Sequence, residues 1–224
     1  MTQDQWTAVD RYFNDLLVAP DPALDSALAA CAAAGIPPYN VSPIQGKLLL
    51  LLARIHGART ILEIGTLGGY SAIWLAQALP PGGRLITLEA DPKHAEVARA
   101  NIARAGLAAV VDVRLGRALD TLPQLAAEGR GPFDLIFLDA DKPNNPEYFA
   151  WALALARRGT LIIADNVVRA GAILDATGGD PIVRGMRRFT ELLGAEPRVS
   201  AIAIQTVGSK GYDGFAIALV TADP

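Results

Sequence analysis

Residues 60–92 read "TILEIGTLGGYSAIWLAQALPPGGRLITLEADP" and decide the fold. An apolar run at 60–64 leads into a glycine-rich loop, a helical pattern occupies 70–79, and a second apolar run follows at 84–89. Further apolar runs at 110–115, 133–139 and 160–165 alternate with helical patterns near 92–105, 118–128 and 146–157. Apolar runs that alternate with helices indicate parallel strands buried on both faces, so we expect an α/β fold with a doubly wound sheet.

Helical sequence precedes this alternating region, and a pair of apolar runs follows it. Residues 1–57 place apolar side chains at helical spacing, with glycine and proline between the segments. The final runs, at 198–207 and 214–220, are separated only by the turn sequence "GSKGYDG", so we expect an antiparallel pair at the sheet edge. We therefore expect a single domain over residues 1–224, with a helical N-terminal cap at 1–57 and a core at 58–224.

The composition favours a globular protein that binds small molecules. The chain has 224 residues, of which 51% are hydrophobic and 19% charged, enough for one large domain. Its net charge is -3 and no basic cluster alternates with aromatic residues, so we expect no nucleic-acid partner. No run approaches the ~20 apolar residues that span a bilayer, so we expect no membrane partner. The N-terminus lacks a secretory pattern and the single Cys31 fits a reducing compartment, so we expect a cytoplasmic protein.

Ligands of such sheets bind just beyond the carboxyl ends of the strands, and the first strand is followed by Gly65, Gly68 and Gly69. These glycines allow a tight turn and close approach of a ligand. Leu67, however, stands where a dinucleotide-binding motif places its second glycine, and Glu63 puts a negative charge where a phosphate would lie. A cationic or neutral ligand suits this loop better, although a glycine turn that only packs a helix on a strand remains an alternative.

The second and third strands end in residues that suit an adenosine. Glu89 stands at the end of the second run, where an acid is expected to bind ribose hydroxyl groups. Alternatively, Glu89 only precedes Asp91, which would cap a helix beginning at Pro92. After the third run, Gly116 and Ala118 are small enough to leave room for a flat ring.

The fourth and fifth strands end in "FDLIFLDADK" and "TLIIADN". Adjacent parallel strands end side by side, so we expect Asp139, Asp165 and Asn166 to converge. Carboxylate and amide oxygens suit Mg²⁺, Mn²⁺ or Ca²⁺ rather than structural zinc. Without a cation the two acids would repel each other and one would hold its proton. The alternative is that Asp165 and Asn166 merely cap a turn.

Lys142 follows Asp139 closely enough to face the same cavity. A nearby cation and a partly dry pocket destabilise an ammonium group, which makes Lys142 a candidate general base, unless it is simply a solvated surface charge. His56 and His94 lie in helical stretches that we expect to be far from the strand ends, and the G-x-S-x-G motif of hydrolases is absent.

The motifs "ILEIGTLGGYS", "LITLEADP", "LDADK" and "ADNVV" together resemble the cation-dependent O-methyltransferases of the catechol and caffeoyl-CoA type, over about residues 38–222. The resemblance implies a Rossmann-like class I methyltransferase fold. This is a seven-stranded, mostly parallel sheet with helices on both faces, a C-terminal antiparallel hairpin and an N-terminal helical extension. It implies S-adenosylmethionine (SAM) as methyl donor, a divalent cation such as Mg²⁺, and a catechol-like or caffeoyl-like small aromatic substrate with vicinal hydroxyl groups.

The same resemblance assigns roles to individual residues. It implies that Lys142 is the catalytic base and that the metal ligands are Asp139, Asp165 and Asn166. It places the methyl donor on Val41, Glu63, Gly65, Thr66, Ser71, Glu89, Ala118 and Asp141. Members of this family commonly form dimers, so it also implies a homodimer in which the N-terminal helices cap the active site and pack against the second subunit.

The chain departs from the animal catechol enzymes, which carry an aromatic residue where Leu67 stands and a tryptophan where Asp141 stands. The "DADK" form looks more like the plant and bacterial branch. The stretch "RAGAILDATGGDPIVRG", residues 169–185, contains glycines suited to a mobile flap, which we expect to influence substrate choice.

Two other functions remain open from the residues alone. A NAD(P)-dependent oxidoreductase on the same fold would need a phosphate-accommodating loop and a pair such as Tyr-x-x-x-Lys, whereas Tyr148 is followed four positions later by Ala152. A catalytically silent adenosyl-binding protein would have lost turnover, but the acid, amide and lysine residues are intact.

Overall fold

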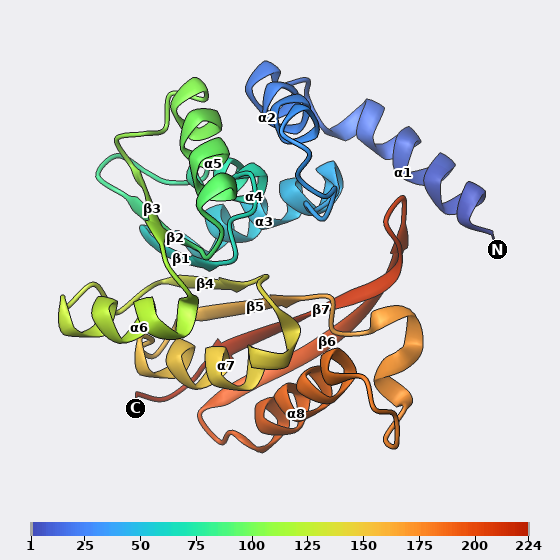
Figure 1. The fold of residues 1–224 in the computed structure, drawn as a ribbon. Coiled ribbons are helices and arrows are strands. Elements are labelled where there is room, and N and C mark those ends of the chain that lie inside the picture. The colour runs from blue at the N-terminus through green and yellow to red at the C-terminus, as the bar shows by residue number, and fades with distance from the viewer. Residues whose placement is uncertain (1, 224) are drawn as a thin grey trace.

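The computed structural model of the chain describes residues 2–223 and is built around a seven-stranded sheet (Figure 1). The strand order is β3-β2-β1-β4-β5-β7-β6. The strands are β1 (Thr60–Ile64), β2 (Arg84–Glu89), β3 (Val111–Leu115), β4 (Leu135–Leu138), β5 (Leu161–Asp165), β6 (Val199–Gly208) and β7 (Gly211–Val220). Neighbours among β1 to β5 pair in parallel, and β7 is antiparallel to β5 and to β6. The predicted α/β fold with a C-terminal antiparallel hairpin is confirmed.

Helices cover both faces of this sheet (Figure 1). One face carries α2 (Pro22–Ala33), α3 (Pro43–His56), α4 (Tyr70–Ala76) and α5 (Pro92–Arg104), and the other carries α6 (Ala118–Ala127), α7 (Asn145–Ala154) and α8 (Pro181–Ala195). Successive strand residues belong to different apolar cores, as Ile61 and Leu62 of β1 do. Because side chains alternate along a strand, a strand buried on both faces is apolar throughout, which explains the continuous runs in the sequence.

The N-terminal helix α1 (Gln3–Leu17) lies beside α3 and the end of the β6–β7 hairpin, and projects from the rest of the molecule (Figure 1). It has no buried residue. None of the helices in the described part of the chain is both long and apolar enough to cross a membrane.

Four helices begin at an Asp or Ser that is followed directly by proline, at Asp21, Ser42, Asp91 and Asp180. The side chain of each accepts a backbone N–H of the first turn, and proline needs no acceptor at that position. Ser42 also forms a reciprocal capping box with Gln45. Local sequence therefore fixes where α3 and α5 begin, and both starting points lie close to the candidate site.

The C-terminal hairpin is longer than the sequence predicts. We expected a turn over 208–214, but Gly208 pairs with Gly211 and only Ser209 and Lys210 lie between the strands. Gly211, directly after these two residues, adopts a φ of 95°, which glycine tolerates without strain, and the following Tyr212 and Asp213 continue the ladder. Asp213 is therefore a strand residue rather than part of a mobile loop.

Candidate functional site

The candidate residues lie along the carboxyl edge of the parallel strands. Glu63 is the penultimate residue of β1, Glu89 ends β2, Asp139 directly follows β4 and Asp165 ends β5. The loops after β1 and β4 touch at Gly65, where an added Cβ would lie 2.4 Å from the carbonyl oxygen of Asp139. Only glycine leaves room for this approach. The glycine-rich loop after β1 and the loop after β4, which begins at Asp139, therefore form one continuous site.

Glu89 holds the glycine-rich loop in place. Its Oε2 accepts the backbone N–H of Leu67 at 2.7 Å, and its Oε1 accepts that of Asp91 at 2.9 Å. Leu67 has a φ of 49°, a left-handed conformation that costs about 1–2 kcal/mol for a residue with a Cβ. The bond to Glu89 offsets this cost. Asp91 caps α5 as the alternative interpretation expects, so Glu89 contacts both the glycine-rich loop and the cap.

Glu63 is an acid with 0% of its surface exposed. Its Oε2 accepts the hydroxyl of Thr87 at 2.6 Å, and the hydroxyl of Thr66 donates in turn to Thr87. The other oxygen, Oε1, has no hydrogen-bond partner among the described residues. Burial raises the pKa of Glu63 to about 8. A positive charge nearby would favour the ionised form, so this carboxyl group suits a cationic ligand.

Thr87 is a site residue that the sequence analysis missed. It is fully buried and paired with Glu63 in the parallel β1–β2 register. The sequence does show a hydroxyl residue within the otherwise apolar part of β2. Its role depends on its position opposite Glu63, however, and that position is set by the pairing of β1 with β2.

Asp139 and Asp165 lie close enough to affect each other's ionisation. Asp165 is 7% exposed, and burial together with the charge of Asp139 raises its pKa to about 7. Burial likewise raises the pKa of Asp139. Two buried acids that resist ionising together are what a divalent cation would neutralise.

Asn166 supplies the third candidate ligand to this pair. It adopts a φ of 59°, which asparagine tolerates better than most residues, and its N–H donates to Asp165 Oδ1 at 2.8 Å. The described residues contain no group of three His, Cys, Asp or Glu side chains suited to a metal, so a metal at this edge would depend on the amide oxygen of Asn166. The carboxylate and amide oxygens fit Mg²⁺, Mn²⁺ or Ca²⁺ by their chemistry.

Lys142 lies beside these acids. It begins the 3-10 turn η1 (Lys142–Asn144), is only 8% exposed, and its Nζ donates to Asp139 Oδ1 at 2.9 Å. It is therefore not a solvated surface charge. Its nitrogen lies beside Asp139, which together with Asp165 forms what we call the acidic cluster.

Asp141 makes side-chain hydrogen bonds within its own loop and with the following helix. Its side chain is exposed, with Oδ2 accepting from Asn144 and Oδ1 accepting the hydroxyl of the buried Tyr148. Tyr148 was considered above only as part of an oxidoreductase pair, whereas here it fixes the orientation of Asp141.

The remaining candidates surround the glycine-rich loop and the adjoining cavity. Ser71 is buried in the first turn of α4, close enough to Glu63 for its hydroxyl to oppose the rise in the pKa of that acid. Ala118 begins α6 next to the ends of β2 and β3 and is half-buried. Val41 is buried in the loop before α3.

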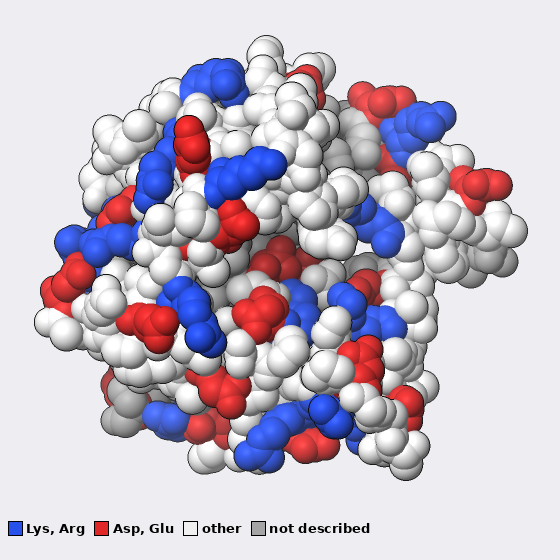
Figure 2. Space-filling view, in the orientation of Figure 1, with Lys and Arg blue, Asp and Glu red and all other residues white. Residues whose placement is uncertain are grey.

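A cavity of about 200 Å³ adjoins the acidic cluster. Its walls include Val41, Asp165, Asn166, Lys210 and Asp213. Figure 2 shows one face of the molecule hollowed near its middle, with acidic side chains inside the hollow and basic ones beside it. On this face Lys and Arg are interspersed with Asp and Glu rather than gathered into one basic area.

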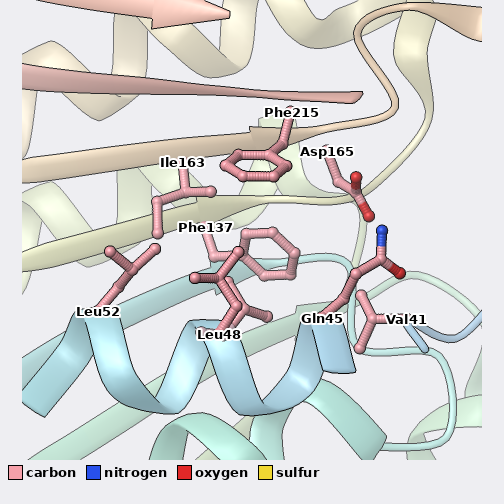
Figure 3. A pocket seen from close by; sticks show the side chains of 9 residues that line it. Val41, Gln45, Leu48, Leu52, Phe137, Ile163, Asp165 and Phe215 are labelled. Atoms are coloured by element: carbon pink, nitrogen blue, oxygen red, sulfur yellow. The ribbon is translucent and has the colours of Figure 1, made fainter. Parts of the chain in front are cut away.

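A smaller apolar cavity lies between α3 and the sheet (Figure 3). The side chain of Gln45 points toward Asp165 there, while its Oε1 accepts the N–H of Ser42 at 2.8 Å. That bond directs the amide nitrogen of Gln45 toward the carboxylate. The sequence analysis missed Gln45, although the capping sequence that begins at Ser42 was a signal for its orientation.

His94 is closer to a strand end than the sequence suggested. Its Nδ1 lies 3.8 Å from Glu89 Oε1, because α5 begins at Pro92 and its first turn stays beside the end of β2. The expectation that both histidines lie far from the strand ends is therefore wrong for His94.

Comparisons with known proteins agree with this fold and identify the family. The family model described as O-methyltransferase matches residues 21–218. A catechol O-methyltransferase from Niastella koreensis is 56% identical over 220 residues, which span 98% of this chain and 100% of that protein. The crystal structure of the O-methyltransferase from Bacillus cereus in complex with SAH has a TM-score of 0.97 and 60% identity, covering 98% of this chain and 100% of that one. TomG from Streptomyces achromogenes, an O-methyltransferase involved in tomaymycin synthesis and solved with SAM, has a TM-score of 0.96 and 54% identity, covering 99% and 100%. The chain belongs to the O-methyltransferase family.

Proposed function

We propose that this methyltransferase moves the methyl group of SAM to one of two vicinal hydroxyl groups on a catechol-like or caffeoyl-like small aromatic, with the help of a divalent cation. Two similar structures contain SAH or SAM, and a relative is named catechol O-methyltransferase. The observation that carries the proposal is the cluster of Asp139, Asp165 and Lys142, which adjoins the glycine-rich loop.

The donor site would use the residues around that loop. Glu63 would place its free Oε1 near the sulfonium charge of SAM, and Glu89 would bind the ribose hydroxyl groups. The buried acid argues against an oxidoreductase, because it would repel the pyrophosphate of a nicotinamide cofactor. The proposed donor-binding residues are Val41, Glu63, Gly65, Thr66, Ser71, Glu89, Ala118 and Asp141.

The metal site would consist of Asp139, Asp165 and Asn166. When bound there, a divalent cation would neutralise the two acids and favour loss of a proton from a nearby hydroxyl group. Mg²⁺ is the ion we expect, and Mn²⁺ or Ca²⁺ fit the same oxygen ligands.

The reaction itself needs little from the protein beyond a base and correct positioning. Lys142, in its neutral form, would accept the proton of one substrate hydroxyl at Nζ. The resulting oxyanion attacks the methyl carbon of SAM in line, so that an O–C bond forms while the S–C bond breaks and SAH leaves. Holding the two reactants in this geometry can contribute on the order of 7–11 kcal/mol in the best oriented cases.

An assay with labelled SAM tests this proposal. Purified protein is given catechols, caffeate derivatives and matched mono-hydroxy compounds, each with and without a chelator. We expect transfer to vicinal diols only, lost on chelation and restored by added Mg²⁺. Turnover of mono-hydroxy compounds that survives chelation would contradict the metal-dependent mechanism, and SAM binding without any turnover would favour a silent adenosyl-binding protein.

We also propose that the protein is a homodimer that buries the outer face of α1. This face exposes Tyr12, Phe13, Leu16 and Leu17, whose exposed fractions are 61%, 44%, 63% and 64%. Contiguous apolar side chains of this kind commonly mark a protein–protein interface.

A further inference from the structure

Asp213 on β7 is a partly buried acid whose side chain accepts hydrogen bonds from three backbone N–H groups. Its Oδ1 accepts the backbone N–H of Val168 at 3.0 Å and of Arg169 at 2.9 Å, and also that of its neighbour Gly214 at 2.9 Å. Val168 lies in the segment that follows the end of β5 at Asp165, and Arg169 begins the 3-10 turn η2 (Arg169–Leu174) that comes next. One carboxylate oxygen therefore fixes the backbone of this loop.

The loop needs such an anchor because its own backbone is strained. Asn166, Arg169 and Ala170 have φ values of 59°, 54° and 53°, all in the left-handed region that residues with a Cβ disfavour. A strained conformation persists only where surrounding contacts hold it. Val168 lies between the strained Asn166 and Arg169, and the second N–H that Asp213 accepts belongs to Arg169 itself, so both bonds act within the strained segment.

The sheet register places Asp213 at this point. Phe215 of β7 pairs with Asp165, the last residue of β5, in an antiparallel register. Asp213 comes two residues before Phe215 in β7 and therefore lies opposite the chain that leaves β5. Val167 N–H also donates to Gly214 O at 3.0 Å, which continues the pairing by one bond. Asp213 lines the same 200 Å³ cavity as Asp165 and Asn166.

We propose that Asp213 is a positioning residue. It holds the backbone from Asn166 to Arg169 and so keeps Asn166 next to Asp165, where its side chain can serve as a metal ligand. The proposal rests on the proposed metal site, because its functional consequence is the affinity for the divalent cation. Asp213 has a second property, since its negative charge lies near Asp139 and Asp165, and a test must separate the charge from the hydrogen bonds.

Two substitutions at one position make this separation. Asp213→Ala removes both the charge and the acceptor, whereas Asp213→Asn removes the charge and keeps an amide oxygen that can accept the same N–H groups. Arg187→Ala serves as a matched control, because Arg187 Nη1 donates to Ile173 O at 2.7 Å and anchors the far end of the same segment.

Calorimetric titration of Mg²⁺ into each SAH-bound variant gives the first readout. We expect Asp213→Ala to weaken Mg²⁺ binding by about 10- to 100-fold, as loss of residues that orient metal ligands usually does. Asp213→Asn and Arg187→Ala are expected to stay close to wild type. Unchanged SAH affinity in all three variants shows that they are folded. Equal weakening by Asn and Ala would assign the effect to charge and overturn the proposal, as would an equal loss in Arg187→Ala.

Amide hydrogen exchange gives a readout that needs no metal. The amides of Val168 and Arg169 are expected to exchange faster in Asp213→Ala and to remain protected in Asp213→Asn. If wild-type protein binds no divalent ion, the proposed metal dependence is wrong, and the anchoring role of Asp213 is then decided by these two amides alone. Unchanged exchange in Asp213→Ala would overturn it.

Discussion

At the scale of the residue, the burial of Glu63 is unfavourable in the unliganded protein, and the proposed donor site would make use of it. Its carboxyl group is fully buried, one oxygen has no hydrogen-bond partner in the described part of the chain, and burial raises its pKa from 4.5 to about 8. Groups that bind a charged ligand often carry such a cost in the free protein. The cost has a pH dependence that can be measured.

We expect Glu63→Gln to raise the melting temperature of the ligand-free protein more at pH 8.5 than at pH 5. Between pH 4.5 and about 8 the folded state binds more protons at this residue than the unfolded state, so wild-type stability falls as pH rises through that range. Glutamine keeps an acceptor for Thr87 but cannot ionise. Thermal unfolding at both pH values measures the difference, and an equal shift at both would show that the pKa of Glu63 is not raised.

Lys142 is expected to be needed for turnover and not for donor binding. Lys142→Met removes the proton acceptor, which typically reduces kcat by about 10²- to 10⁴-fold. SAH affinity should stay unchanged, because the side chain of Lys142 donates to Asp139, which is a proposed metal ligand and not a proposed donor-binding residue. The control is Lys47→Met, on α3 and outside the walls of both cavities. A Lys142→Met enzyme with wild-type kcat at neutral pH would exclude this lysine as the base.

At the scale of elements, a glycine-to-alanine substitution, which adds one methyl group, can test the close approach of the loops after β1 and β4. Gly65 has a φ of 103° and no room for a Cβ beside Asp139, whereas Gly57 has a φ of 69° and nothing within 4 Å. Gly57→Ala should therefore cost about 1 kcal/mol of stability and leave activity per folded molecule intact. Gly65→Ala should cost more and also weaken SAH binding, since both loops must move. Equal effects in denaturant unfolding and SAH titration would mean that the loops do not touch.

The opposite end of the sheet depends on a different acid. Asp134 Oδ2 accepts the N–H groups of Arg59 and Thr60 at 2.8 and 2.9 Å, which joins the starts of β1 and β4, and Arg157 pairs with its Oδ1. We expect Asp134→Ala to lower the free energy of unfolding by about 3 kcal/mol, because two partly buried N–H groups lose a charged acceptor. The kcat of the folded fraction should not change, because the proposed active site lies at the opposite, carboxyl edge of the sheet. A normal urea midpoint would contradict this role.

The sequence was sufficient for the order of elements and for the residues that end each strand. Continuous apolar runs identified β1 to β5, and parallel pairing then required Asp139 and Asp165 to share one edge. It was not sufficient for contacts made across the sheet. Thr87 matters because it pairs with Glu63, and Asp213 because it pairs beside the chain after β5. Both depend on strand register, which no short motif encodes.

At the scale of the whole molecule, α1 exposes large apolar side chains that would be more stable against a protein partner than in water. Its exposed Leu16 and Leu17 extend a face that already carries Tyr12 and Phe13. We expect the wild-type protein to have the mass of a dimer in light scattering at micromolar concentration. Leu16→Glu with Leu17→Glu should give a monomer, because four charges at a two-fold interface repel each other.

The matched control for this interface is Leu174→Glu, which places a charge on an apolar side chain that is 84% exposed outside α1. It should leave the dimer intact. A wild-type protein that is monomeric, or a double variant that remains dimeric, would show that α1 does not form the interface.

A crystal of the wild-type protein grown with SAH and Mn²⁺ tests most directly whether this edge of the sheet holds a cation. We expect one anomalous peak within coordination distance of side-chain oxygens of Asp139, Asp165 and Asn166, next to Lys142. A crystal that contains SAH but shows no peak there, or shows these three side chains turned away from one another, would contradict a metal-dependent transfer.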